Sequence, residues 1–239
     1  MGIDTPETVH TQKEEQPYGQ EASNYTKTRL ENGDKIELEY DSNSSSGNPY
    51  IGGIVGKSFA GNIFNCYNNG NIKQNNFSVG GITGGADNTI VKNCYNSGEI
   101  TGVGQVGGIV GRISATSILN CYNSGKIISN KEASGGIVGS GYNTIIKECY
   151  HKGNISGKSE QKPNAFEGGI VGDSYSADNI ELCKWYSDTI EYAVGSLGIT
   201  DGYTINLEMP DIISIINDEN TFKEDKNNIN NGYPILNWE

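Results

Sequence analysis

Five cysteines occupy one position of a repeating pattern, and they offer the chain its widest choice of chemistry. They are Cys66, Cys94, Cys121, Cys149 and Cys183. Cysteines in a secreted protein first suggest disulfides. However, equivalent residues of stacked repeats have parallel Cα–Cβ bonds ~4.8 Å apart, further than the ~3.8 Å between the Cβ atoms of a disulfide. A straight column also cannot surround a zinc ion tetrahedrally. We therefore expect five free, mostly buried thiols, with no metal and no cofactor.

A tyrosine follows each of the first four cysteines. These candidate ligand-binding residues are Tyr67, Tyr95, Tyr122 and Tyr150. If cysteine points into the core of a strand, the next residue points outward. Four rings in a column could bind a glycan or a protein, because tyrosine offers an apolar face and a hydroxyl group. The same rings could instead pack on one another and shield the wall, and the sequence leaves both possibilities open.

The motifs that would indicate an enzyme are incomplete. Residues 53–58 end in Gly-Lys-Ser like a P-loop, but Ile51 stands where that motif needs glycine. Residues 102–107 match a dinucleotide-binding pattern in letters only, because no βαβ unit surrounds them. The two histidines, His10 and His151, cannot form a His-Glu-x-x-His zinc site. No repeat position carries a column of carboxylates, which a β-helix polysaccharide-degrading enzyme requires. We expect the chain not to be an enzyme.

Two sequence blocks recur at fixed spacing through the middle of the chain. Gly-Gly-Ile-Val-Gly, once with Thr for Val, begins at Gly52, Gly80, Gly107, Gly135 and Gly168, in steps of 28, 27, 28 and 33 residues. Asn-Cys-Tyr-Asn or a variant of it follows in each repeat. The apolar pieces between glycine and asparagine are too short for helices and rich in β-branched residues, which favours three short strands per repeat. Asn and Gly suit the left-handed backbone of the corners between strands.

This pattern predicts an all-β fold, a parallel β-solenoid (β-helix) of about five ~28-residue coils with N- and C-terminal caps. One coil cannot bury its own apolar face, so the coils must stack and equivalent residues must form ladders. The isoleucine of each glycine block should form one buried column beside the cysteines. These residues are Ile54, Ile82, Ile109, Ile137 and Ile170.

The blocks Gly-Gly-Ile-Val-Gly and Ile-x-Asn-Cys-Tyr-Asn-x-Gly-x-Ile resemble the GLUG-motif repeats of large bacterial surface and secreted proteins. Such repeats also occur beside the peptidase domain of IgA-cleaving metalloproteases. The ending at residues 231–238 is similar to the close of such arrays in clostridial surface proteins. The resemblance covers residues 51–186, and the fifth repeat departs from it because Lys184-Trp185 replaces Tyr-Asn. It implies a non-catalytic extracellular module of a Gram-positive-type surface protein, acting in adhesion or as a spacer. The alternatives are a glycan-binding module and a β-helix polysaccharide-degrading enzyme.

Composition and charge exclude several partners. The net charge is −12, which disfavours nucleic acid as a partner. No apolar run reaches the ~18 residues of a membrane helix, so we expect no membrane insertion. The acidic excess lies in residues 1–50 and 187–239, and most simply serves solubility. The expected partner is a host or cell-surface protein or glycan.

The sequence divides into four parts. Residues 1–23 have no apolar periodicity and no signal peptide, and we expect a flexible tail. Residues 24–50 contain the alternating stretch Lys35–Tyr40, a candidate cap strand and loop. Residues 51–186 form the solenoid, with a surface loop at 157–167. Residues 187–239 form a C-terminal cap, with a short helix after Pro210 and an apolar plug of Phe222, Tyr233, Ile235, Leu236 and Trp238.

Overall fold

The computed structural model describes residues 50–75, 77–157, 166–175, 179–187, 189–197 and 221–239, and the backbone of 204–206. These residues form strands and turns without a helix, which confirms the all-β prediction. The predicted cap strand at 35–40, the helix after Pro210 and most of the loop at 157–167 lie outside the described residues.

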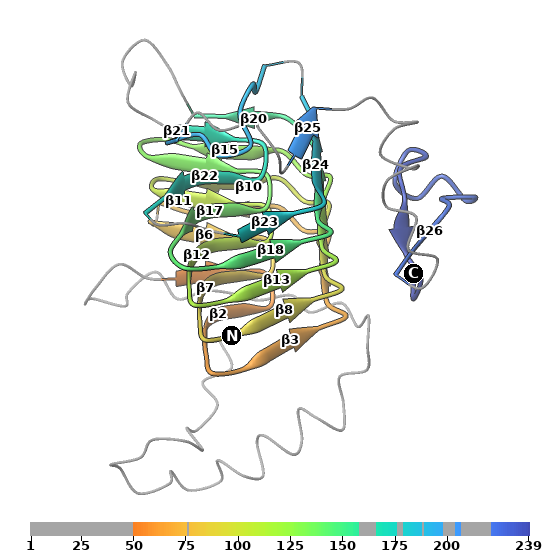
Figure 1. The fold of residues 1–239 in the computed structure, drawn as a ribbon, viewed down its shortest axis with the longest axis horizontal. Coiled ribbons are helices and arrows are strands. Elements are labelled where there is room, and N and C mark those ends of the chain that lie inside the picture. The colour runs from red at the N-terminus through yellow and green to blue at the C-terminus, as the bar shows by residue number, and fades with distance from the viewer. Residues whose placement is uncertain are drawn as a thin grey trace, which may run out of the picture.

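The strands stack into five sheets, here called walls, and the strands within each wall run parallel (Figure 1). Wall 1 contains β1 (Tyr50–Gly52), β6 (Ser78–Gly80), β11 (Gln105–Gly107), β16 (Ala133–Gly135) and β21 (Phe166–Gly168). Wall 2 contains β2 (Val55–Phe59), β7 (Thr83–Asp87), β12 (Val110–Ser114), β17 (Val138–Gly141) and β22 (Val171–Ser174). Wall 3 contains β3 (Asn62–Phe64), β8 (Ile90–Lys92), β13 (Ser117–Leu119), β18 (Ile145–Lys147) and β23 (Asn179–Glu181).

Two further walls complete each coil. Wall 4 contains β4 (Tyr67–Asn68), β9 (Tyr95–Asn96), β14 (Tyr122–Asn123), β19 (Tyr150–Lys152), β24 (Cys183–Tyr186) and β25 (Thr204–Asn206). Wall 5 contains β5 (Ile72–Lys73), β10 (Ile100–Gly102), β15 (Ile127–Ser129) and β20 (Ile155–Ser156). Four coils are therefore complete, and in the described residues the fifth has strands in walls 1 to 4 only. Each coil has five short strands rather than the three we predicted, because the paired glycines and the left-handed corners divide the apolar pieces.

The ladders follow the sequence repeat. Wall 3 pairs Ile63 with Val91, and Val91 with Ile118, in register. Wall 4 pairs Tyr122 with both Tyr95 and Tyr150. Residues at the same position of successive repeats therefore stack on one another along the axis of the solenoid.

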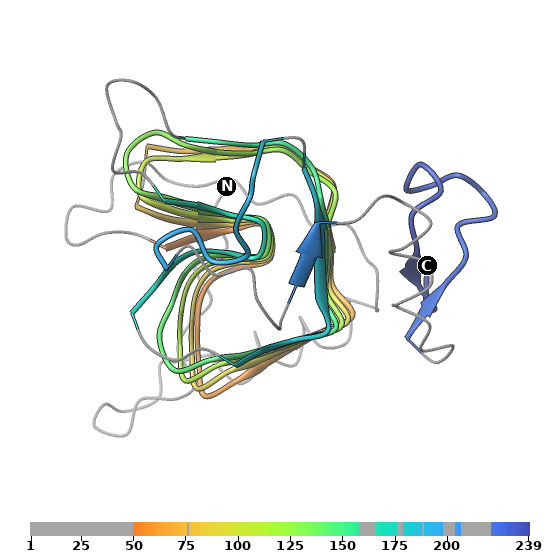
Figure 2. The ribbon, with the colours of Figure 1, turned by 45° about the horizontal axis from the view of Figure 1, so that its top comes forward.

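Each coil folds inward between walls 1 and 2, at the paired glycines (Figure 2). The inward fold divides the interior into two apolar clusters. The larger contains the isoleucine column and the buried cysteines, with Ile82, Ile109, Ile137 and Ile170 fully buried and Ile54 packed at its edge. The smaller lies between walls 1 and 5, around Val79, Ile100, Val106 and Ile127. The predicted isoleucine column is confirmed.

Both glycines of a pair are required because no side chain fits at the inward fold. A Cβ on Gly107 would lie 2.0 Å from the carbonyl oxygen of Val110. A Cβ on Gly108 would lie 2.2 Å from the carbonyl oxygen of Gly136 and 2.4 Å from Cγ of Asn123. The turn nevertheless keeps its coil-to-coil hydrogen bonds, with Ile109 N donating to Ile137 O at 2.9 Å.

Asparagine supplies the corner between walls 3 and 4, as the sequence indicated. Asn65, Asn93 and Asn120 have φ angles of 52°, 54° and 53°. In the fourth and fifth coils Glu148 and Leu182 take the same left-handed conformation, at 53° and 52°. Non-Gly residues adopt this conformation at a cost that is lowest for Asn and Asp. Glu148 and Leu182 therefore make these two corners less favourable than asparagine would.

The chain covers the fifth coil with residues 190–196. Ile170 N donates to Ala193 O at 3.0 Å, the same bond that Ile137 N makes to Ile170 O one coil below. Trp185 takes the place of the repeated asparagine, and its Nε1 donates to Ile190 O at 3.2 Å. Trp185 and Ile190 are both buried. This segment therefore satisfies backbone groups that the last coil would leave open.

The inward fold yields a stability prediction. Gly108→Ala should lower the free energy of unfolding by ~1–3 kcal/mol or more, because its Cβ collides with backbone and with Asn123. Gly70→Ala is the matched control, since its Cβ would meet only Asn68 Oδ1 at 3.5 Å. Urea unfolding of both variants checks this, and equal stability of the two would contradict it.

The buried isoleucine column yields a second stability prediction. Ile109→Ala should cost ~2–5 kcal/mol, because Ile109 is fully buried in the larger cluster. Chemical unfolding monitored by circular dichroism measures the change, and a loss below ~1 kcal/mol would show that this column does not carry the core.

Candidate functional site: the tyrosine wall and the C-terminal segment

The four candidate tyrosines form a continuous ring stack on the outer face of wall 4. Ring centroids are 5.1 Å apart for Tyr67 and Tyr95, with planes 8° apart. Tyr95 and Tyr122, and then Tyr122 and Tyr150, are each 4.9 Å apart, with planes within 3° of parallel. The structure therefore brings the sequence-predicted site residues together in the predicted column.

An amide ladder lies behind the tyrosines, and our sequence analysis missed it. Asn68 Nδ2 donates to Asn96 Oδ1, and Asn96 Nδ2 to Asn123 Oδ1, both at 2.7 Å. Asn96 and Asn123 are fully buried, and their Nδ2 atoms also donate to the carbonyl oxygens of Gly98 and Gly125. The fixed spacing of asparagine and the later glycine is the signal that could have revealed this ladder.

His151 continues the ladder in the fourth coil as a neutral ring. It is fully buried, and burial lowers the pKa of His151 to about 4. Its Nε2 lies 2.9 Å from Gly153 O, and its Nδ1 lies 3.0 Å from Asn123 Nδ2. A ring protonated at Nε2 donates to the Gly153 carbonyl and accepts from the Asn123 amide at Nδ1, which also lies 3.1 Å from Asn123 O.

The C-terminal segment, residues 221–239, covers part of the tyrosine column. It is a small antiparallel pair of β26 (Phe222–Lys223) and β27 (Ile235–Leu236). Phe222 and Leu236 are buried in one cluster with Tyr122 and Tyr150, and Trp238 lies 5.7 Å from the ring of Tyr95 and 6.2 Å from that of Tyr67. We expected the apolar residues of this segment to cover the end of the core. Most of them instead contact the tyrosines on the outer face of wall 4.

Hydrogen bonds fix this segment to the same rings. The hydroxyl of Tyr122 donates to the Glu239 carboxylate, at 3.0 and 2.9 Å from its two oxygens. The hydroxyl of Tyr150 donates to Pro234 O and accepts from Asn230 Nδ2 at 2.7 Å. Burial, with Tyr150 and Glu239 nearby, raises the pKa of Tyr122, so the hydroxyl stays protonated as a donor.

Asp225 organises the turn between the two strands. Its carboxylate accepts the backbone N–H groups of Ile229 and Asn230, both at 2.7 Å, and of Gly232 at 3.0 Å. Burial opposes ionisation, but these bonds hold the pKa of Asp225 below its usual value. These three donors occupy the carboxylate oxygens, so Asp225 stabilises the turn.

Coverage by the segment limits what the column can bind. Tyr122 and Tyr150 are 1% and 0% exposed, whereas Tyr67 and Tyr95 are partly exposed. A ligand using all four rings would have to displace residues 221–239. The proposed ligand-binding role of Tyr67, Tyr95, Tyr122 and Tyr150 stays a prediction, and the C-terminal segment is their observed partner.

The cysteine column is a second candidate that proves to be part of the core. Cys94, Cys121, Cys149 and Cys183 are buried and Cys66 is partly buried, all as free thiols. Cys121 Sγ donates to Leu119 O at 3.2 Å, and the same sulfur accepts from Cys94 N at 3.4 Å. Burial raises the pKa of Cys121, Cys149 and Cys183. Cys121, Cys149 and Cys183 are therefore inert structural thiols, and the described residues hold no cluster of three metal-ligating side chains.

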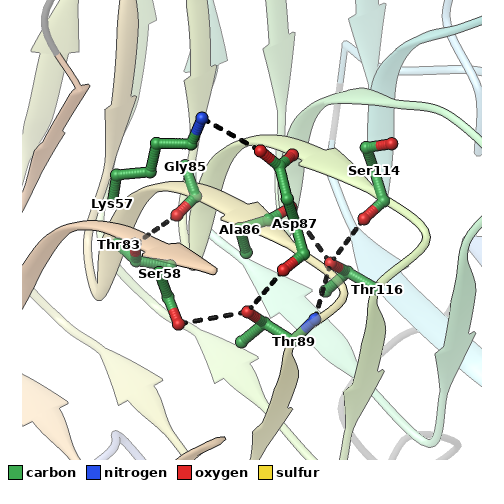
Figure 3. Close-up of polar contacts among 9 residues, drawn as sticks. All are labelled: Lys57, Ser58, Thr83, Gly85, Ala86, Asp87, Thr89, Ser114 and Thr116. Carbon is green, nitrogen blue, oxygen red and sulfur yellow. Dashed lines mark hydrogen bonds and ion pairs between the residues drawn. The ribbon is translucent and has the colours of Figure 1, made fainter. Parts of the chain in front are cut away.

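Hydroxyl, carboxylate and amine groups also meet at the corner between walls 2 and 3 (Figure 3). Lys57 Nζ lies 3.0 Å from Asp87 Oδ2. Thr89 Oγ1 lies within bonding distance of Ser58 Oγ and of Asp87 O, at 3.1 and 3.0 Å. Thr116 Oγ1 donates toward Ala86 O at 3.0 Å. These hydroxyls are directed at neighbouring backbone, so the cluster holds the corner together and offers no activated nucleophile.

The repeats match a known family model. Residues 75–101 and 102–128, the second and third coils, match the model described as the GLUG motif. This confirms the resemblance drawn from the glycine and cysteine blocks.

A solved structure shares the fold. It is the crystal structure of a "putative immunoglobulin A1 protease" from Bacteroides ovatus, with a TM-score of 0.58 and 27% sequence identity. The similarity covers 74% of this chain and 58% of that chain, so the solenoid corresponds to little more than half of that protein.

The N-terminal part has a different similarity, which our sequence analysis did not find. Residues 1–75 match the family described as Staphylococcal nuclease homologue. Thermonucleases of Staphylococcus hyicus and Staphylococcus intermedius are 56% and 54% identical over 41 residues. That stretch is 17% of this chain, and the chain spans only about a quarter (24%) of each thermonuclease. A repeat search could not reveal it, because residues 1–49 carry neither repeat block.

The C-terminal segment yields a testable prediction. Tyr150→Phe should destabilise its attachment by ~1–3 kcal/mol, because Asn230 Nδ2 and Pro234 O lose their buried hydroxyl partner. Limited trypsin digestion should then cut faster after the exposed Lys226. Tyr142→Phe, which alters a ring 54% exposed, is the matched control and should leave the cutting rate unchanged.

The buried histidine yields a pH prediction. Its pKa is lowered to about 4 in the folded chain, so the unfolded chain binds a proton first as pH falls below ~6.5. Stability should therefore fall between pH 6.5 and 4, by up to about 3 kcal/mol. His151→Asn restores the repeated residue and should remove this component. Urea unfolding at pH 7 and pH 4.5 measures it, and an unchanged pH dependence in the variant would contradict a neutral buried ring.

Proposed function

We propose that this chain is a non-catalytic, extracellular repeat module of a larger bacterial surface protein, acting in adhesion or as a spacer. The GLUG-motif matches and the fold shared with the Bacteroides ovatus protein support this proposal. The partner is a host or cell-surface protein or glycan. A glycan-binding module is the second candidate, and a β-helix polysaccharide-degrading enzyme the third.

One observation supports the proposal that the chain is not a catalyst. The repeat positions that face outward on wall 3 carry no column of acids: they are Phe64, Lys92, Leu119, Lys147 and Glu181, in register. In the described residues the polar groups that do cluster, at the corner of Lys57 and Asp87, hold one another and the backbone. At these wall 3 positions Glu181 is the only acid, so they do not offer the paired carboxylates that glycan cleavage needs.

The outer face of wall 3 supports adhesion. Phe64, Ile90 and Ile145 are 45%, 41% and 45% exposed on it, among the side chains of Lys92 and Lys147. Exposed apolar side chains gathered on a flat sheet are typical of protein-binding surfaces. A spacer would have no use for them.

The similarity to thermonucleases does not lead us to propose a nuclease activity for this chain. The matched stretch corresponds to 24% of those enzymes. Part of the family match, residues 50–75, forms the first solenoid coil from β1 to β5. A stretch of ~40 residues is too short to bury a core of its own, so this stretch alone gives no support for a nuclease activity.

The purified chain should therefore turn over no substrate suggested by its relatives. We expect no cleavage of acidic polysaccharide, immunoglobulin A or DNA, with or without added divalent metal. Reducing-end, gel and fluorescence assays measure the three. Sustained turnover that survives repurification would contradict the proposal.

Cell attachment distinguishes adhesion from a spacer role. Beads coated with the chain should bind host cells, and Ile90→Ser with Ile145→Ser should reduce that binding several-fold without changing the melting temperature. Tyr175→Ser, at a residue 66% exposed elsewhere, is the matched control. Absence of attachment by the unmodified chain would assign the module to spacing.

A further inference from the structure

A polar groove lies where the C-terminal segment meets wall 4. Its volume is about 370 Å³, at the small end of the ~300–1,000 Å³ of ligand pockets. The solenoid contributes one side and residues 229–233 the other. The lining residues are Ser97, Ser124, Lys152, Gly153, Asn154, Tyr186, Ser187, Ile229, Asn230, Asn231 and Tyr233.

Lys152 is the charged group of this groove. Its Nζ donates to Asn230 O at 2.7 Å and lies 4.2 Å over the ring of Tyr233. An ammonium group has three donors, so this carbonyl uses one of them. Partial burial lowers the pKa of Lys152 to about 8, which leaves it mostly protonated at neutral pH.

Among the described residues, no carboxylate pairs directly with Lys152 in this groove. None of its lining residues is acidic. Asp225 is the nearby carboxylate that favours the charged lysine, but three backbone N–H groups occupy its oxygens. A half-buried cation without an ion-pair partner favours an anionic ligand.

The other lining groups suit a ligand with many hydroxyls. Ser97, Asn154 and Asn231 are exposed at the groove and offer donors and acceptors in several directions. Tyr186 and Tyr233 provide ring faces beside them, and Tyr combines an apolar face with a polar hydroxyl. A sugar ring has that same mixture of apolar C–H faces and hydroxyl edges.

We propose that this groove binds a sugar that carries a carboxylate, with the carboxylate on Lys152 Nζ and the ring between Tyr186 and the Ser97–Ser124 edge. The site is separate from the tyrosine column, because none of those four tyrosines lines it. It needs the C-terminal segment in place, since residues 229–233 form one of its sides. It deepens the proposed function, on which it rests for its biological setting, by naming a ligand class for the adhesive module.

The test is a titration of the full ¹⁵N-labelled chain, followed by NMR. Glucuronate should shift the amide signals of Ser97, Ser124 and Gly153, with a dissociation constant at least about tenfold below those of glucose and acetate. Equal binding of acetate would reduce the groove to a simple anion site and overturn the sugar part. Equal binding of glucose would overturn the role of Lys152, and no shift with glucuronate would overturn the whole proposal.

Two variants make the outcome specific to the groove. Lys152→Met should weaken glucuronate binding about tenfold, whereas Lys226→Met, at an exposed lysine of the same segment, should not. Because Lys152→Met also loosens Asn230, Ser124→Phe provides a second test, which fills the groove and leaves residue 152 unsubstituted. It should abolish binding while the Trp238 fluorescence stays unchanged, and undiminished binding would overturn the site. Free sugar is measured without cells, so this result and the attachment result can fail independently.

Discussion

The contact between the paired glycines and the inward side chain of wall 4 determines the shape of each coil; that side chain is asparagine in the first three coils, His151 in the fourth and Trp185 in the fifth. At Gly108 the backbone of the inward fold lies so close to Asn123 that a Cβ would stand 2.4 Å from its amide carbon. The Asn123 amide bonds in three directions: to the coil before it, to the coil after it and to Gly125 of its own coil. Such an amide is expensive to bury unless fully bonded. The ladder therefore fixes both the register of the coils and the depth of the fold.

The outward surface of wall 4 is a consequence of this ladder. Because side chains alternate along a strand, an inward asparagine places the preceding tyrosine outward. Stacking then gives a column of rings with hydroxyls at its rim, and the C-terminal segment uses both the faces and the hydroxyls. The same geometry that could display the column to a ligand gives the chain a place to attach its own end. The groove beside Lys152 exists because the segment covers only part of the wall.

Much of the fold could be predicted from the repeat, because ladders turn sequence spacing into vertical position. The isoleucine and cysteine columns, the asparagine corners and the ring stack all followed from that rule. The docking of Phe222, Leu236 and Trp238 did not, because they lie far from the wall in sequence and match no repeat position. Their hydrophobicity indicated burial and could not indicate where. The groove was equally inaccessible, since it joins residues 97–154 to 229–233 across the chain. The amide ladder was visible in the sequence as Asn before x-Gly, but a polar residue was not assigned to the interior.

The most direct test of the central contact is hydrogen exchange of the side-chain amides, measured by NMR in the folded chain. If the asparagines form a buried ladder beneath the inward fold, the Nδ2 protons of Asn96 and Asn123 exchange orders of magnitude more slowly than those of exposed asparagines such as Asn231. They should also keep that protection until the solenoid unfolds. Exchange of all these amides at the same fast rate would contradict the ladder, and with it this explanation of how each coil is shaped.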